Sequence, residues 1–407
     1  MTSLAAWTST DGGGDESAEH EAARLVHEAE TALHDARESG VDAWSASAAE
    51  HGGDRLSWAG CQIQQAQQHH PFMRLTYRRD RTRIQSGGIT RTVTTSDGVS
   101  LSVREYGSRD PAHTVVLLHG LCLAKGSWTI PIDHLLHQYG DSIRIISYDH
   151  RGHGDSAAAP MHTYHIDRLA ADLADLLAAL GVAGPLTLAG HSMGGMVALA
   201  YLGRPADQRP VQPDGLILVA TAAGKLTGRG LGRLLATPAT DVLYELARHV
   251  PRAAERAFRA LARPACGVLV RIGGYGTASW DVRVAMSVAT INATPVATKA
   301  GFLRALRDYD QYQTLSSITA ATVVISGGAD RLTPPSHAHD LAVGIPGAVR
   351  VHRPAASHML LDEAPHEISN AIVDVIGGGR TGAMRRRVMC NHAKPISRQP
   401  LSSREAC

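Results

Sequence analysis

The chain has 407 residues, of which 44% are hydrophobic, and its 40 basic residues nearly balance its 38 acidic ones, for a formal net charge of +2. A chain of this size and composition can bury a sizeable core, and so small a net charge argues against nucleic acid or an anionic membrane as a partner. The five cysteines are scattered and form no CxxC pair, so neither a disulfide framework nor a zinc site is indicated. We expect no metal and no cofactor.

The opening residues MTSLAAWTSTDGGGDE lack the basic segment and the apolar run of a secretory signal. The sequence also contains no stretch of about eighteen apolar residues that could form a spanning helix. We therefore expect a cytoplasmic protein without a membrane span. No pattern in the sequence indicates its oligomeric state.

Residues 1–88 differ in composition from the rest of the chain, because they are rich in Ala, Glu, His, Gln and Gly and poor in β-branched runs. A narrow, alanine-rich apolar stripe over residues 16–39 could form a helix. We predict a poorly ordered N-terminal extension that lies outside the main fold.

From Arg91 onward, alternating and apolar patterns typical of strands begin. Alternating residues on both sides of the Asp97–Gly98 turn predict a β-hairpin. Apolar runs that suit buried parallel strands then follow, namely TVVLLHG (114–120), IRIISYD (143–149), LTLAGHS (186–192), GLILVAT (215–221) and ATVVISGG (321–328). Helical patterns such as IDRLAADLADLLAAL (166–180) separate them. The alternation predicts an α/β fold with a mostly parallel, doubly wound sheet of about eight strands.

About a hundred residues with helical character interrupt this alternation after the sixth strand. We predict a helical cap over residues 225–318, inserted into a core formed by residues 89–224 and 319–377. A second independent domain is the weaker alternative, because the chain leaves and re-enters the sheet at neighbouring positions. The glycine-led, basic segment 378–407 predicts a disordered tail.

The segment GHSMG, residues 190–194, places a serine between a predicted strand and a helical pattern. Such a sharp turn strains the serine backbone and needs small flanking residues. It presents the Ser192 hydroxyl at a helix N-terminus, where the Met193 amide can donate to a developing oxyanion. GxSxG occurs by chance, but the strand before it and the helix after it favour a nucleophile over an incidental serine.

A nucleophilic serine needs a histidine as general base and a group that orients this histidine. Asp330 follows the run ATVVISGG, and His358 follows the next strand-like run, AVRVHRPAA. Both positions bring side chains to the sheet edge that carries Ser192. The competing interpretations are that Asp330 caps the helix near Pro334 and that His358 is an ordinary loop histidine. Asp362 is a weaker candidate for the acid.

A second oxyanion donor is expected in the loop after the third strand. This loop reads His119-Gly120-Leu121-Cys122. Gly120 allows a tight turn, so that the Leu121 amide can face the serine while the Leu121 side chain lines the pocket. We interpret Cys122 as a small apolar loop residue.

These motifs together resemble the α/β-hydrolase fold superfamily. The resemblance covers about seven-tenths of the chain, residues 91–376, and rests on the HG of LLHGL, on YDHRGHGDS, GHSMGG, GGADRLTPP and ASHMLLDEAP in that order. YDHRGHGDS is similar to the family's DxRGxGxS element, which implies a structural role for its residues Asp149, Arg151, Gly152, Gly154 and Ser156.

The resemblance implies a lipase-like or carboxylesterase-like enzyme of EC 3.1.1 type. We expect it to cleave a small hydrophobic carboxylic ester, lactone or thioester with water through an acyl-enzyme on Ser192. Carbon–carbon bond hydrolases and cofactor-free haloperoxidases or perhydrolases use the same triad and remain alternatives. Epoxide hydrolases and haloalkane dehalogenases place aspartate at the elbow, so the serine argues against both. An alternative of another class is a non-catalytic ligand-binding protein with this fold.

Overall fold

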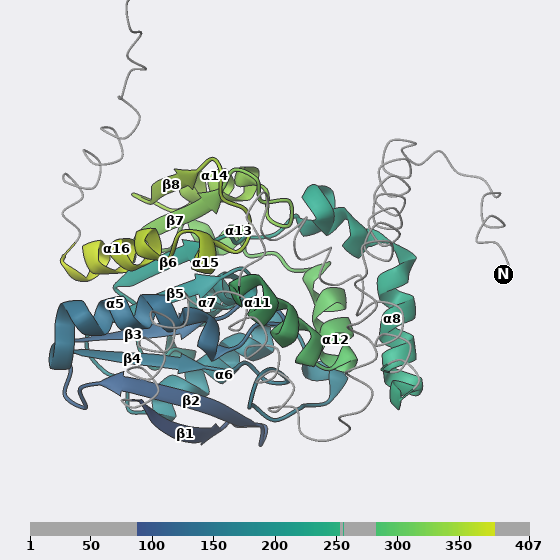
Figure 1. The fold of residues 1–407 in the computed structure, drawn as a ribbon, viewed down its shortest axis with the longest axis horizontal. Coiled ribbons are helices and arrows are strands. Elements are labelled where there is room, and N and C mark those ends of the chain that lie inside the picture. Colours follow the sequence, from purple (N-terminus) through teal and green to yellow (C-terminus); the bar gives the residue numbers. More distant parts are fainter. Residues whose placement is uncertain (1–87, 253–254, 256–281, 379–407) are drawn as a thin grey trace, which may run out of the picture.

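The computed structural model describes residues 88–252, 255 and 282–378, and Figure 1 shows their arrangement. The predicted N-terminal extension and tail, with the helix over residues 16–39, lie almost entirely outside the described residues. An eight-stranded sheet has the order β1-β2-β4-β3-β5-β6-β7-β8. Its strands are β1 (Ile89–Thr94), β2 (Ser100–Gly107), β3 (His113–Leu118), β4 (Ile143–Tyr148), β5 (Leu186–His191), β6 (Gly215–Val219), β7 (Ala321–Gly327) and β8 (Val349–Arg353).

The sheet is parallel except at one edge. Strands β1 and β2 form the predicted antiparallel hairpin, and β2 pairs antiparallel with β4. All remaining neighbours, from β4 through β3 to β8, run parallel. The predicted α/β class with a mostly parallel sheet of about eight strands is therefore confirmed.

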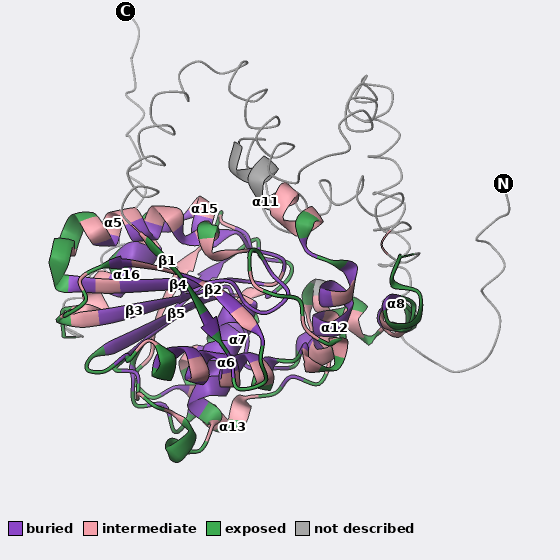
Figure 2. Cartoon of the chain, turned by 90° about the horizontal axis from the view of Figure 1, so that it is seen from below, coloured by how far each residue is buried: buried purple, intermediate pink, exposed green. Residues whose placement is uncertain are grey.

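Helices cover both faces of the sheet because its central strands are apolar on both sides. Val115 and Leu117 of β3 belong to the core cluster formed with α5 and α16, whereas Val116 and Leu118 belong to the cluster formed with α6 and α7. Figure 2 shows the two helical layers on opposite sides of the buried strands. These helices are α5 (Thr129–Tyr139), α6 (Ile166–Ala179), α7 (Met193–Gly203), α14 (Pro335–Gly344), α15 (Leu360–Glu363) and α16 (Pro365–Ile376).

Between β6 and β7 the described residues form α8 (Pro238–His249), α11 (Val282–Ala293), α12 (Val296–Leu306) and α13 (Tyr312–Leu315). The sequence GFLRALRDYDQYQTL (301–315), part of the segment with predicted helical character, does not form one continuous helix, because it is broken between α12 and α13. At this break the Gln311 amide donates to Ala223 O at 2.6 Å, and the Asp310 side chain accepts from the Tyr312 amide at 2.9 Å. Tertiary and local hydrogen bonds therefore replace the helical ones. The assignment of this segment as a cap domain stays a prediction.

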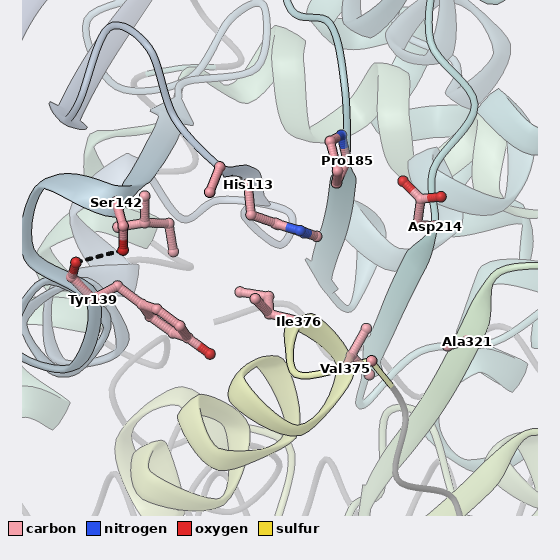
Figure 3. A pocket seen from close by; sticks show the side chains of 11 residues that line it. His113, Tyr139, Ser142, Pro185, Asp214, Ala321, Val375 and Ile376 are labelled. Carbon is pink, nitrogen blue, oxygen red and sulfur yellow. Dashed lines mark hydrogen bonds between the residues drawn. The ribbon is translucent and has the colours of Figure 1, made fainter.

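A cavity of about 660 Å³ opens at the amino-terminal edge of the parallel strands (Figure 3). Its polar side chains have local partners. The His113 Nε2 atom lies 2.9 Å from Thr187 Oγ1, and Asp214 Oδ2 accepts from the Leu186 amide at 3.1 Å. This edge is opposite to the one at which β5 leads into Ser192. In the ranges that the structure describes, no helix combines the length and the apolarity needed to cross a membrane.

Candidate active site

Ser192 sits in a strained turn between β5 and α7, with φ 51° and ψ −118°. Its amide donates to Val219 O at 2.9 Å, which ties the turn to the neighbouring strand. Glycines are required on both sides: a Cβ on Gly190 would lie 2.5 Å from the Gly194 carbonyl, and a Cβ on Gly194 would overlap the backbone of Leu118. The turn therefore holds the serine in a left-handed backbone at the N-terminus of a helix.

The structure brings the three predicted side chains into one hydrogen-bonded chain. His358 Nε2 lies 3.1 Å from Ser192 Oγ, and His358 Nδ1 lies 2.9 Å from Asp330 Oδ2. An ionised carboxylate can only accept, so His358 Nδ1–H donates to Asp330 and leaves Nε2 to accept the Ser192 hydroxyl proton. Asp330 and His358 are 4% and 5% exposed, so the hydrogen bond between them is shielded from water.

Asp330 is buried and lies within hydrogen-bond distance of four donors. Besides His358, the amides of Leu332 and Thr333 donate to Oδ1 at 2.8 Å each, and the Thr333 hydroxyl lies 2.7 Å from Oδ2. Burial alone would raise the pKa of this carboxyl, but the charge and hydrogen bond of His358 and the bonds from Thr333 lower the pKa overall. The side chain makes no cap bond to α14, whose N-cap residue is Pro334. Asp330 thus closes the turn before that helix.

Thr333 is a site residue that the sequence analysis did not identify. Its hydroxyl oxygen lies 2.7 Å from Asp330 Oδ2, 2.9 Å from Ala220 O and 3.3 Å from His358 Nδ1. A hydroxyl has a single proton, so it donates to either the carboxylate or the carbonyl at one time. Its only sequence signal is its place three residues after Asp330, which is also typical of ordinary turns.

His191, the second residue of the elbow, was also missed. Its Nε2 lies 2.9 Å from His358 O, and because a carbonyl only accepts, the ring donates there. Burial, followed by the nearby His358, lowers the pKa of His191 to about 3, so the ring is neutral at neutral pH. His191 therefore holds the backbone of His358.

The two predicted oxyanion donors lie in segments that meet at the serine. Met193 is the first residue of α7, where amides have no acceptor within the helix. A Cβ added to Gly120 would lie 3.3 Å from Ser192 Cβ and 2.8 Å from His191 Nδ1, so the loop after β3 runs against the elbow. Leu121 follows Gly120 directly and is half-buried against the core.

The loop after β4 is fixed by a buried guanidinium. Arg151 donates to both carboxylate oxygens of Asp172 at 2.7 and 2.6 Å, and to both oxygens of Asp97 at 2.9 Å each. The side chains of Arg151 and Asp172 are buried, so the bonds between them are shielded from water, whereas Asp97 is partly exposed. They join the β1–β2 turn, this loop and α6. In the described part of the chain, no group of three or more His, Cys, Asp or Glu side chains is arranged to hold a metal ion.

Comparison with known proteins shows the family to which the chain belongs. The model of the alpha/beta hydrolase fold family matches residues 113–365, which is more than half of the chain. The chain therefore belongs to the α/β hydrolase fold family.

Three relatives illustrate the range of the family. The chain is 25% identical over 272 residues to the sn-1-specific diacylglycerol lipase ABHD11 of Mus musculus, covering 64% of this chain and 80% of that one. It is 37% identical over 113 residues to a non-heme chloroperoxidase of Streptomyces lividans, covering 28% of this chain but only 39% of that one. The enol-lactonase from Burkholderia xenovorans LB400 superposes with a TM-score of 0.56 at 27% identity, covering 70% of this chain and 100% of that one. These similarities support a hydrolase activity.

Proposed function

We propose that the chain is a serine hydrolase that cleaves a hydrophobic carboxylic ester, lactone or thioester through an acyl-enzyme. The observation that carries the proposal is the hydrogen-bonded chain from Ser192 Oγ through His358 to Asp330. A serine hydroxyl is a weak nucleophile at its ordinary pKa, and an adjacent base that is oriented by a carboxylate activates it.

In the first half of the reaction, Ser192 Oγ attacks the substrate carbonyl carbon while its proton passes to His358 Nε2. The carbonyl oxygen gains the displaced electron pair, and the amides of Leu121 and Met193 stabilise this negative charge. Asp330 stabilises the positive charge on the imidazolium ring. When the tetrahedral intermediate collapses, the carbon–oxygen or carbon–sulfur bond to the leaving group breaks, and that group takes the proton from His358.

In the second half, His358 Nε2 removes a proton from water, and the resulting hydroxide adds to the acyl carbon. Collapse of this intermediate breaks the bond to Ser192 Oγ, which recovers its proton from His358. The products are the carboxylic acid and the alcohol or thiol, or a single hydroxy acid from a lactone, and one water is consumed in each turnover.

The substrate class is supported by the relatives and by the predicted cap. Acylglycerols and enol-lactones, which appear in the names of two relatives, are both carboxylic esters. A helical segment that packs over the carboxyl-terminal edge of a sheet favours a largely apolar pocket with few polar groups. A hydrophobic acyl group is therefore the expected occupant.

The test uses the variant Ser192→Ala and a series of p-nitrophenyl esters with increasing acyl length. We expect wild-type turnover and fast labelling by a fluorophosphonate, and loss of both in the variant by about four orders of magnitude or more. Ser316→Ala, which changes an exposed serine, is the matched control and should behave as the wild type. Retained hydrolysis by Ser192→Ala at an unchanged melting temperature would remove this serine from the mechanism. A wild type without labelling would favour a ligand-binding protein.

A second candidate activity is peracid formation, which the similarity to the non-heme chloroperoxidase favours. In this reaction hydrogen peroxide in place of water attacks the acyl-enzyme, and the acyl group leaves as a peracid. The measurement is peracid release from a short-chain ester in the presence of hydrogen peroxide, compared with acid release without it. Peracid yields that exceed hydrolysis would make this activity the primary one.

A further inference from the structure

The loop that carries the Leu121 amide contains a strained turn. In residues 120–123, here named the oxyanion turn, the Leu123 amide donates to Gly120 O at 3.1 Å. Cys122 in this turn has a φ of 61°, in the left-handed region that disfavours side chains with a Cβ. Such a conformation persists only where the surrounding structure holds it. The residues that hold this turn therefore also determine where the Leu121 amide lies.

The ring of His119 contacts the oxyanion turn in a single tautomer. The His150 amide lies 3.0 Å from His119 Nε2, and since a backbone amide can only donate, Nε2 carries the lone pair. The proton of the neutral ring is then on Nδ1, which lies 2.8 Å from Gly120 O and donates to it. Burial lowers the pKa of His119 to about 4, which keeps the ring neutral at neutral pH.

The Gly120 carbonyl and the Leu121 amide belong to the same peptide bond. A trans peptide is planar, and its C=O and N–H groups point in opposite directions. A hydrogen bond that fixes Gly120 O on one side therefore also sets the direction of the Leu121 N–H on the other side. His119 Nδ1 and the Leu123 amide both donate to this oxygen.

The ring of His150 holds the preceding peptide. Its Nε2 lies 3.1 Å from His119 O, and the ring is the donor because a carbonyl only accepts. The two rings lie 4.4 Å apart, and both side chains are fully buried, so water does not compete for these bonds.

The far end of the same loop is held by the residue before His150. Asp149 Oδ1 accepts from the Lys125 amide at 2.6 Å, and Asp149 Oδ2 accepts from Lys125 Nζ at 2.5 Å. Two adjacent residues of the loop after β4 thus hold both ends of segment 119–125.

We propose that His119 and His150 are positioning residues that aim the Leu121 amide at the oxyanion. His119 sets the orientation of the Gly120–Leu121 peptide, and His150 fixes the tautomer of His119 through its amide and the preceding carbonyl through its ring. The inference deepens the proposed hydrolase function and rests on it.

The experiment compares His119→Leu with His119→Asn. Leucine has no donor, whereas the asparagine amide nitrogen can donate to Gly120 O from near the Nδ1 position. The readouts are kcat and KM for a p-nitrophenyl ester and the inhibition constant of an alkyl trifluoromethyl ketone, whose adduct with serine bears an oxyanion. We expect His119→Leu to lower kcat by about 10- to 100-fold with little change in KM. The inhibition constant should rise by a similar factor, and His119→Asn should recover most of both losses.

A second pair of variants tests the other ring, so that the result does not depend on one substitution that unfolds the protein. His150→Phe removes the donor to His119 O, and His150→Gln retains an amide donor near Nε2. The matched control is His153→Leu. His153 is buried in the same loop with its ring 5.2 Å from that of His119, but its Nδ1 bonds to Arg151 O. We expect this control to lower the melting temperature and leave kcat and the inhibition constant unchanged.

Several outcomes would overturn the inference while the proposed function stands. These are wild-type kcat and ketone inhibition in both His119→Leu and His150→Phe, equal losses in His153→Leu, or losses that the amide variants fail to recover. A wild type that hydrolyses no ester and reacts with no fluorophosphonate overturns the proposed function instead, and the inference with it.

Discussion

The two edges of the parallel sheet differ in their backbone and in their buried polar groups. In the described residues, all four non-glycine residues with left-handed φ, namely Cys122, Ser192, Ala220 and Lys225, follow the carboxyl ends of strands β3, β5 and β6. The amino-terminal edge carries an open cavity of about 660 Å³. Its polar side chains bond to nearby backbone and hydroxyl groups, as His113 does with Thr187.

The two edges differ in which side chains they bring together. Loops that follow neighbouring parallel strands converge at one edge, where each can deliver a side chain to a common point. The strain of Ser192 and the burial of Asp330 persist because the surrounding hydrogen bonds compensate for them. At the amino-terminal edge no such convergent chain joins the cavity residues in the described structure. The strained backbone and the hydrogen-bonded side chains of Ser192, His358 and Asp330 therefore mark the candidate site, whereas the cavity at the amino-terminal edge has neither feature among the described residues.

The largest expected effect comes from the buried carboxylate. Asp330→Asn should lower kcat for a p-nitrophenyl ester by about 10⁴-fold, because an amide that donates to His358 favours the wrong tautomer. Asp214→Asn, at the cavity of the opposite edge, is the control and should change kcat by less than about twofold. Comparable losses of kcat in both variants would show that the catalytic effect is not specific to the carboxyl-terminal edge.

The next largest effect is on the pH dependence of the free energy of unfolding. Burial lowers the pKa of His119 to about 4 and those of His153 and His191 to about 3. Below about pH 6.5 the unfolded chain binds protons that these folded rings do not, so the free energy of unfolding falls as the pH falls. Between the unfolded pKa of about 6.5 and its folded pKa, each ring lowers the free energy of unfolding by up to about 1.4 kcal/mol for each pH unit of acidification. Above about pH 6.5 these rings cause no such loss of stability.

The measurement is urea unfolding between pH 7.5 and 4.5. His153→Leu should reduce the slope of the free energy of unfolding against pH by the equivalent of about one bound proton. His113→Gln at the amino-terminal edge should reduce it less, because His113 is only partly buried and its pKa is lowered to a smaller extent. A free energy of unfolding that stays constant from pH 7 to 5 would contradict the neutral, buried state of these rings.

A smaller effect is expected from Thr333. Thr333→Val removes the hydroxyl that contacts Asp330, Ala220 O and His358, and should lower kcat by about 3- to 10-fold, in line with one lost hydrogen bond. Thr333→Ser keeps the hydroxyl and should restore most of the activity. The comparison of kcat in the two variants at equal folded fraction separates the hydroxyl from the methyl group, and equal losses would assign the effect to packing.

The smallest effect is expected from a substitution in the cavity at the amino-terminal edge. Val375 lines the cavity at the amino-terminal edge, and Val375→Phe adds a ring to this space. We expect kcat and KM within about twofold of the wild type, since the cavity lies away from the chain of Ser192, His358 and Asp330. A marked change in either constant would show that the two edges are coupled.

Much of the fold follows from local sequence patterns. Apolar runs on both faces predict buried parallel strands, and the strand-turn-helix pattern around Ser192 predicts the elbow that the structure contains. The break between α12 and α13 was not predicted, because it depends on a hydrogen bond from Gln311 to Ala223, which is distant in sequence. Helical periodicity reports neighbours within a few residues and carries no information on such contacts.

By itself, the sequence determined the α/β class and the order of strands and helices along the chain. It also determined that Ser192, Asp330 and His358 follow predicted strands. These features depend on short-range patterns of apolar residues and glycines, which one segment expresses alone. Only the tertiary structure decided that Thr333 contacts the acid, that His191 holds the backbone of His358, and that the His119 tautomer is set by the amide of His150. Each of these depends on a particular atom of one loop that lies within about 3 Å of another, and such a distance is fixed by packing of the whole sheet and its helices.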